Sequence, residues 1–207
     1  MYFEGAFARA SVLVHLFEYV GQPWKWNKLS QEKYGQMCAA GEMGEFGKGL
    51  PQIQVSMNGK SQQMAQTNAI LRSFGMRYGL YDPRDWKAAR YCDQVVETNG
   101  DVIGACFPIL GGGPIEPFLA VTKKFHNMIE KNLAHHGGKY VAGNKITIAD
   151  ITTCSYISCF IKNKHPGNKV AAPNAAQLSE TPRFAEYIER MCKEFPYILN
   201  RVVEDPY

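Results

Sequence analysis

A proline at the start of an apolar strand, followed by a hydroxyl residue at the start of a helix, constrains this chain more than any other feature. Pro51 precedes the β-branched residues Ile53 and Val55, and a proline is tolerated at the first position of a strand. Thr67 precedes residues 68–74, whose apolar side chains have helical spacing, so Thr67 is predicted to be the N-cap of a helix. The sequence therefore predicts a proline turn beside a helix N-terminus.

These two features together predict a binding site for a small ligand. The first N–H groups of a helix have no partner within the helix and carry partial positive charge, which favours a carboxylate. If the Leu50–Pro51 bond is cis, a form that costs only about 0.5–1 kcal/mol before proline, the turn exposes the N–H and C=O of Leu50 on one side. Such a pairing suits a ligand with a peptide backbone and a free carboxylate. Taken singly, each half also fits an ordinary strand start and an ordinary capped helix.

The patterning of the chain changes near Pro83. Before it, short strands alternate with helices, over residues 1–7 (strand and turn), 9–19 (helix), 25–49 (strand, short helix and loop), 53–55 with 62–65 (a hairpin across Asn58-Gly59) and 67–79 (helix). After it, only helical periodicity is present, over residues 88–107, 118–133, 148–161 and 184–191. We therefore expect an α/β domain over residues 1–80 and an all-α domain over residues 81–207.

Composition excludes several classes of function. The net charge of +4 is spread along the chain, and no nucleic-acid-binding motif accompanies it, so nucleic acid is not an expected partner. No apolar run approaches about 20 residues, so no membrane span is expected. No secretory signal is expected either, and this leaves a mitochondrial address open. The six cysteines lack CxxC or metal-ligand spacing, which indicates no metal and reduced thiols in the cytoplasm.

A third motif lies in the helical half. Thr147-Ile148-Ala149-Asp150 matches a capping box, in which the threonine side chain caps the helix and the aspartate reaches back to the threonine N–H. The helix that follows is largely apolar and is predicted to be central. We assign both residues a structural role and no catalysis.

With the proline turn and the Gln66-Thr67 pair, this box makes nearly the whole chain resemble the cytosolic glutathione transferases. The motifs are most similar to those of the classes that use a catalytic tyrosine: sigma, mu, alpha and pi. The resemblance implies a thioredoxin-like N-terminal domain, an all-helical C-terminal domain, glutathione as co-substrate without a metal, and a cytoplasmic homodimer that acts in detoxification.

The resemblance also implies roles for individual residues. The hydroxyl of Tyr2 would stabilise the glutathione thiolate, although Tyr2 also fits a plain strand aromatic. Glutathione itself would be bound by Arg9, Lys48, Leu50, Gln66, Thr67 and, across the dimer, Asp101. Trp24, Lys28 and Tyr34 are alternatives to Lys48, and Asp101 also fits a solvated helix position. Phe107 and Pro108 would bound the pocket for the second substrate.

Two readings of function follow. The first is a homodimeric glutathione transferase that conjugates the thiol to small hydrophobic electrophiles. The alternative is a subunit of a larger assembly that has the same fold and little or no catalysis. A short first strand before Tyr2 and the extra Gly49 before Leu50-Pro51 favour the alternative, whereas the retained Gln66, Thr67 and Asp101 favour the enzyme.

Overall fold

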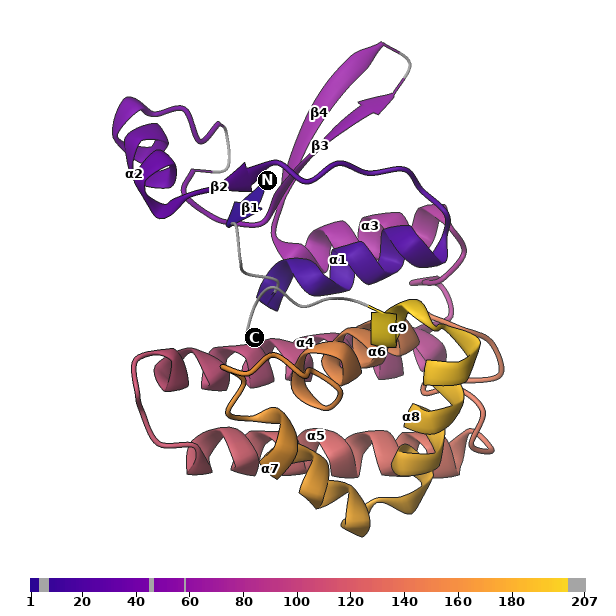
Figure 1. Ribbon diagram of the computed structural model, residues 1–207. Coiled ribbons are helices and arrows are strands. Elements are labelled where there is room, and N and C mark those ends of the chain that lie inside the picture. The colour runs from indigo at the N-terminus through magenta and orange to yellow at the C-terminus, as the bar shows by residue number, and fades with distance from the viewer. Residues whose placement is uncertain (4–7, 45–46, 58, 201–207) are drawn as a thin grey trace.

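The computed structural model describes residues 1–3, 8–44, 47–57 and 59–200. Figure 1 shows a mixed α/β part above a larger helical part, with the helices α1 and α3 facing the helical part. Two predicted features, the turn within residues 4–7 and the hairpin residue Asn58, lie outside the described residues.

The N-terminal part begins with short strands that the prediction placed correctly. Its elements are β1 (Tyr2–Phe3), α1 (Ala8–Tyr19), β2 (Lys28–Leu29), α2 (Gln31–Ala40), β3 (Gln52–Met57), β4 (Lys60–Ala65) and α3 (Thr67–Arg77). β1 pairs with β2 in parallel, and β3 pairs with β4 in antiparallel register from Gln52↔Ala65 to Met57↔Lys60. Met1 and Gln52 exchange two backbone hydrogen bonds, of 2.6 and 3.1 Å. This exchange connects the β1–β2 pair, through the residue before β1, to the first residue of β3.

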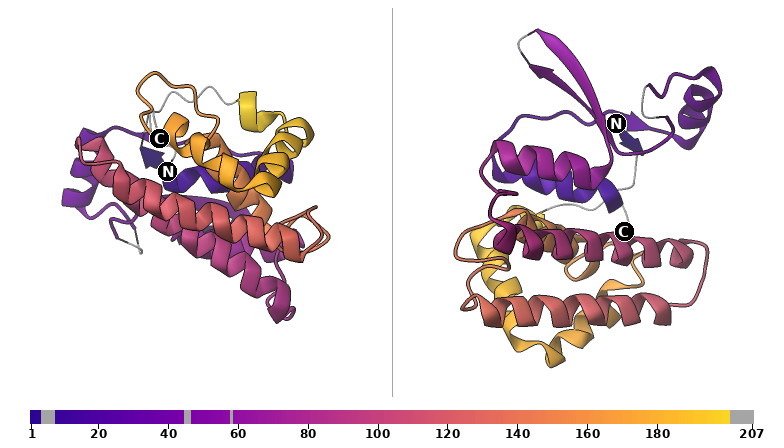
Figure 2. Two further views of the ribbon diagram at one scale, coloured as in Figure 1. Left: turned by 90° about the horizontal axis from the view of Figure 1, so that it is seen from below. Right: turned by 180° about the vertical axis from the view of Figure 1, so that it is seen from behind.

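The C-terminal part is helical, as the sequence predicted. It comprises α4 (Trp86–Leu110), α5 (Glu116–His135), α6 (Ile148–Phe160), α7 (Ala171–Ala176), a 3-10 turn (Gln177–Glu180), α8 (Pro182–Glu194) and α9 (Tyr197–Asn200). The long helices α4 and α5 run side by side in both views of Figure 2. The sequence did not predict α7, α9 or the 3-10 turn, which are short and lack a full period of apolar residues.

Helix α6 forms the centre of the molecule. All 13 of its residues are buried, and it packs against α1, α4 and α3. Gly75 on α3 lets the two parts approach closely, because a Cβ at that position would lie 2.6 Å from the side chain of Ile148. Ile148 also donates its N–H to the carbonyl of Leu80 at 3.0 Å. The core is thus continuous between the two parts, and the predicted boundary at residue 80 stays a prediction.

The capping box at the start of α6 is confirmed. Thr147 accepts a hydrogen bond from the N–H of Ala149 at 3.2 Å, and Asp150 accepts the N–H of Thr147 at 2.9 Å. Asp150 is completely buried and also accepts from the N–H of Val141 and the hydroxyl of Tyr187, both at 2.9 Å. Its carboxyl therefore ties the start of α6 to α8 and to the loop that precedes α6.

A second buried polar cluster lies among α5, α6 and α7. Nε2 of His126 lies 2.7 Å from the hydroxyl of Tyr156, and Asn174 donates to that hydroxyl at 2.8 Å and to the carbonyl of Phe160 at 2.8 Å. Burial lowers the pKa of His126 to about 4, so the ring is neutral near pH 7. These bonds hold α7 against the core although α7 has only six residues.

The sequence predicted no membrane span and reduced cysteines, and the structure bears on both points. Within residues 1–3, 8–44, 47–57 and 59–200, no helix is both long and apolar enough to cross a membrane. The six cysteines, all of which the structure describes, form no disulfide; five are buried and Cys38 is half-buried.

Candidate functional site

A pocket of about 270 Å³ lies where α1, the proline turn, α3 and α4 meet. Arg9 lines it from the first turn of α1, Leu50 from the turn before β3, and Gln66 and Thr67 from the start of α3. These four residues are spread over 58 positions of sequence, from Arg9 to Thr67, and each was proposed as a ligand contact. The structure brings them together around one cavity.

The start of α3 supplies the polar end of this pocket. Gln66 has a positive φ of 69°, and its carbonyl accepts the N–H of Ile70 at 3.0 Å, so Gln66 is the N-cap. The prediction that Thr67 caps the helix is wrong, because Thr67 already has helical backbone geometry. No side chain at Gln66 caps the helix. The first N–H groups of α3, at residues that line the pocket, thus keep their capacity to bind an anion.

The proline turn forms the adjoining wall. The Leu50–Pro51 peptide bond is cis, which was one of the two forms that the sequence allowed. Leu50 is half-buried and lines the pocket. Pro51 is buried and faces a second, larger cavity of about 1070 Å³. The two cavities therefore meet at this peptide bond.

Arg9 supplies the charge of the pocket. Its guanidinium lies 5.4 Å from the centroid of the Phe107 ring, so it bridges the start of α1 and the end of α4. No ion pair joins Arg9 to a carboxylate in the part of the chain that the structure describes. The described lining contains this one cation and no carboxylate. Both the guanidinium and the α3 N-terminus therefore favour an anionic ligand.

Helix α4 adds residues that the sequence analysis missed. Asn99 and Gly100 line the pocket, and Asn99 is 5% exposed. Its Oδ1 is buried and accepts no hydrogen bond from any described residue. Asn99 lies on the same helix face as the buried Val95, Val96 and Val102. An amide at helical spacing within an apolar stripe was the available signal.

A polar network fixes α4 against α3 beside the pocket. Arg72 donates to Asp93 at 2.7 Å and to Glu97 at 2.6 Å, and Asn68 donates to Glu97 at 2.9 Å. Partial burial opposes the charged form of Arg72, but the hydrogen bonds to Glu97 and Asp93 outweigh it and raise the pKa of the guanidinium. The network holds the N-terminus of α3 at a set distance from Asn99.

The remaining predicted residues lie outside the lining of this pocket. Tyr2 is buried and lines the larger cavity, where its ring lies 6.4 Å from that of Trp26. Lys48 is exposed, and its carbonyl accepts the hydroxyl of Tyr34 at 2.9 Å. The roles proposed for Tyr2 and Lys48 stay predictions.

The predicted residues on α4 are exposed. Asp101 is exposed one position beyond Gly100. Phe107 and Pro108 lie exposed in the last turns of the helix. Their roles also stay predictions. Among the described residues, no group of three or more His, Cys, Asp or Glu could hold a metal ion.

Comparisons with known proteins agree with this arrangement. Residues 118–191 match the model of the glutathione S-transferase C-terminal domain. The chain is 28% identical over 110 residues to glutathione S-transferase alpha-5 of Rattus norvegicus, covering 50% of this chain and 48% of the relative. It is 32% identical over 104 residues to glutathione S-transferase A of Cavia porcellus, covering 47% and 46%. The matched region thus spans about half the length of these curated relatives.

Solved structures extend the similarity of fold to the whole chain. Monomeric Na-GST-3, a glutathione S-transferase of the hookworm Necator americanus, superposes with a TM-score of 0.72 at 20% identity, covering 98% of this chain and 94% of its own. The glutathione S-transferase of Ascaris lumbricoides gives 0.70 at 22% identity, covering 100% and 96%. The predicted fold, a thioredoxin-like part followed by a helical part, is confirmed. The helical part is thus similar to the C-terminal domain of glutathione S-transferases, and the whole chain shares the fold of these solved structures.

Proposed function

We propose that the protein is a glutathione transferase, which joins the thiol sulfur of glutathione to small hydrophobic electrophiles. The observation that carries the proposal is the convergence of Arg9, Leu50, Gln66 and Thr67 on one pocket that holds positive charge and no carboxylate. Glutathione has a peptide backbone and a free carboxylate at each end, which matches those groups. It is a co-substrate here, and no metal is proposed.

Each group of the pocket has a proposed task. The N–H groups at the start of α3 and the hydroxyl of Thr67 hold the γ-glutamyl carboxylate. The backbone of Leu50 pairs with the peptide of the ligand, Arg9 neutralises charge, and Lys48 reaches the glycine end. The Oδ1 of Asn99 accepts no hydrogen bond from a described residue. We propose that the Asn99 side chain forms a hydrogen bond with the bound tripeptide.

The proposed reaction is nucleophilic substitution or addition by the thiolate. The thiol proton must leave before attack, since the thiolate is the nucleophile. A carbon–sulfur bond then forms while the leaving group departs with its electron pair, or while the electron pair moves onto an activated double bond. The hydroxyl of Tyr2 is proposed to stabilise the thiolate, because Tyr2 lines the same larger cavity as Pro51, the residue that follows Leu50. Phe107 and Pro108 are proposed to receive the electrophile.

A second candidate is a protein that binds glutathione and assembles with other proteins without catalysis. The observation that favours it is the position of Tyr2, which lines the larger cavity and not the pocket. A homodimer built on α4, in which Asp101 reaches the partner's glutathione, is proposed under the first candidate. The first candidate predicts that the protein catalyses conjugation and the second does not, whereas both predict that it binds glutathione.

Calorimetric titration of glutathione tests the site. Thr67→Ala is expected to weaken binding about tenfold or more, because a hydrogen bond to a charged group contributes about 1.5–3 kcal/mol. Ser73→Ala is the matched control, since Ser73 lies on the same helix and does not line the pocket. Equal affinity in wild type and Thr67→Ala would disprove the assignment. Conjugation of a generic electrophile, measured with the same proteins, separates the two candidates.

A further inference from the structure

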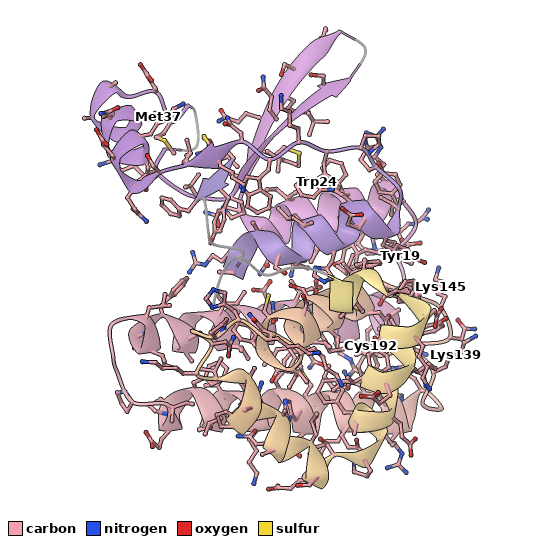
Figure 3. All side chains as sticks on the ribbon, in the orientation of Figure 1. Tyr19, Trp24, Met37, Lys139, Lys145 and Cys192 are labelled. Carbon is pink, nitrogen blue, oxygen red and sulfur yellow. The ribbon has the colours of Figure 1, made fainter. Side chains whose placement is uncertain are left out.

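The pocket of about 270 Å³ is exposed at one end and buried at the other. Arg9, Leu50 and the residues at the start of α3 are exposed or half-buried. The buried lining residues come from α1, α3, α4 and α6, and we call this set the inner end: Val12, Leu71, Val96, Asn99, Ile103 and Thr152. Figure 3 shows side chains filling the space between the α1/α3 layer and the helical part, to which these helices contribute.

Asn99 is the unusual polar residue of the inner end. It is 5% exposed, and its Oδ1 accepts no hydrogen bond from the residues that the structure describes. Thr152, the other polar residue of the set, donates its hydroxyl to the carbonyl of Ile148 at 2.7 Å. Buried polar atoms in folded proteins are nearly always hydrogen-bonded, because a buried acceptor without a donor is destabilising. The acceptor of Asn99, in the lining of a pocket, therefore indicates a donor that a ligand supplies.

The chemistry of glutathione limits which of its donors can reach this wall. The γ-glutamyl end has its amino group and its α-carboxylate on the same carbon. The proposed function places that carboxylate on the N–H groups at the start of α3, so the ammonium lies in the same part of the pocket. The hydrogen bond from Asn68 to Glu97, of 2.9 Å, holds the start of α3 against α4. Asn99 follows Glu97 by two positions and lines the same pocket as Thr67.

The ammonium needs an acceptor that the rest of the lining supplies poorly. An ammonium group has three N–H donors and no acceptor. Arg9 and the N–H groups of α3 are donors as well, and the lining contains no carboxylate within the described ranges. Oδ1 of Asn99 lies below the pocket surface. Rotation about the Cβ–Cγ bond, which is a soft torsion in asparagine, brings it to the surface and breaks no hydrogen bond that Oδ1 makes with a described residue.

We propose that Oδ1 of Asn99 accepts a hydrogen bond from the α-ammonium of glutathione, and that this contact selects ligands with a free amino group at the γ-glutamyl end. The inference rests on the proposed function and adds to it a residue that determines specificity. It places recognition of the amino group within one subunit. Asp101, which the family resemblance assigns to glutathione across the dimer, is then not the main source of this selectivity.

Two ligands that differ only in the amino group test the contact. Glutathione and glutaryl-cysteinylglycine, which has hydrogen in place of that amino group, are titrated by calorimetry into wild type and Asn99→Leu. Wild type should bind glutathione at least about tenfold more tightly, since a hydrogen bond to a charged group is lost with the analogue. Asn99→Leu is similar in size and has no acceptor, so it should bind the two ligands about equally. If leucine prevents folding, Asn99→Val makes the same comparison.

Asn132→Leu is the matched control. Asn132 is also a buried asparagine on a long helix, with 6% exposure and an Nδ2 that lacks a hydrogen-bond partner among the described residues, and it does not line the pocket. This variant should keep the wild-type preference for glutathione. Thermal unfolding followed by circular dichroism checks that each variant folds. Equal loss of the preference in Asn132→Leu would trace the effect to removal of a buried amide and would overturn the proposal.

The remaining outcomes separate this inference from the proposed function. A preference that is unchanged in Asn99→Leu would overturn the inference, and its loss in Asp101→Asn would assign the ammonium to Asp101. If wild type binds both ligands equally, the amino group is not recognised, so the inference is wrong while the glutathione site stands. If wild type binds neither ligand, the proposed function fails and the inference fails with it.

Discussion

Asp150→Asn should destabilise the protein strongly although it changes a single atom of the side chain. In the wild type, Oδ1 of Asp150 accepts from the N–H of Val141 and the hydroxyl of Tyr187, and Oδ2 accepts from the N–H and the hydroxyl of Thr147. The residue is completely buried, so water cannot replace a lost partner. Burial raises the pKa of Asp150, and the hydrogen bonds from Val141 and Thr147 oppose that shift.

The magnitude follows from which donors lose an acceptor. An asparagine presents one oxygen and one NH₂ group, so in either orientation the NH₂ group faces a backbone N–H, of Val141 or of Thr147. The neighbouring hydroxyl can rotate to accept, but the backbone N–H cannot. A buried N–H without an acceptor lowers the free energy of unfolding by about 1–3 kcal/mol, and the weakened hydrogen bond to the hydroxyl lowers it by about 1 kcal/mol more. The expected loss in the free energy of unfolding is about 3 kcal/mol.

Urea unfolding followed by far-UV circular dichroism measures this loss. The matched control is Asp82→Asn, because Asp82 is an exposed aspartate whose ion pair is with its near neighbour Arg84. That control should leave the midpoint unchanged. At roughly 2–4 °C per kcal/mol for a chain of this size, Asp150→Asn should also lower Tm by about 6–12 °C. A loss below about 1 kcal/mol, or equal effects of the two variants, would refute the reasoning.

Three further changes have definite expected outcomes. Tyr2→Phe should lower the conjugation rate about ten- to hundredfold at pH 7 with little change in glutathione affinity, because a hydrogen bond to the thiolate contributes about 1.5–3 kcal/mol; an unchanged pH–rate profile would leave a protein that only binds. The free energy of unfolding should fall by up to about 3 kcal/mol as pH drops from about 6.5 to about 4. Burial lowers the pKa of folded His126 to about 4, so in this range the unfolded ring takes up a proton that the folded ring does not. The unfolding midpoint of His126→Gln should depend less on pH, and an equal dependence would contradict this. Asp101→Asn should weaken glutathione binding a few-fold while light scattering still reports a dimer, and a wild-type monomer that conjugates glutathione would refute the cross-subunit role.

Local sequence patterns determined most of the architecture. Helical spacing and the glycines that follow it located α4 and α5, and the capping box located the start of α6, because these signals arise from residues near in sequence. The hairpin β3–β4 was also predicted from alternation and a turn signal. The short elements α7 and α9 were missed, since they are held by buried contacts such as those of Asn174 and carry too little periodicity of their own.

Residue chemistry at the proline turn and the α3 start also predicted that Leu50 and Thr67 belong to one site, and the family resemblance added Gln66. The N-cap was misassigned to Thr67 because a residue with positive φ at Gln66 is uncommon and leaves no signal in composition. Asn99 was missed because its signal, an amide within an apolar stripe, does not say which cavity it lines; only the tertiary packing of α4 brings Asn99 to the pocket.

The tertiary structure alone decided which cavity each residue faces. Tyr2 lines the larger cavity, whereas Leu50 lines the pocket. The two cavities are lined by the two residues of one peptide bond, Leu50 and Pro51, and the side on which a side chain falls depends on how Met1 pairs with Gln52. That pairing is a contact between residues 51 positions apart, which no local pattern encodes.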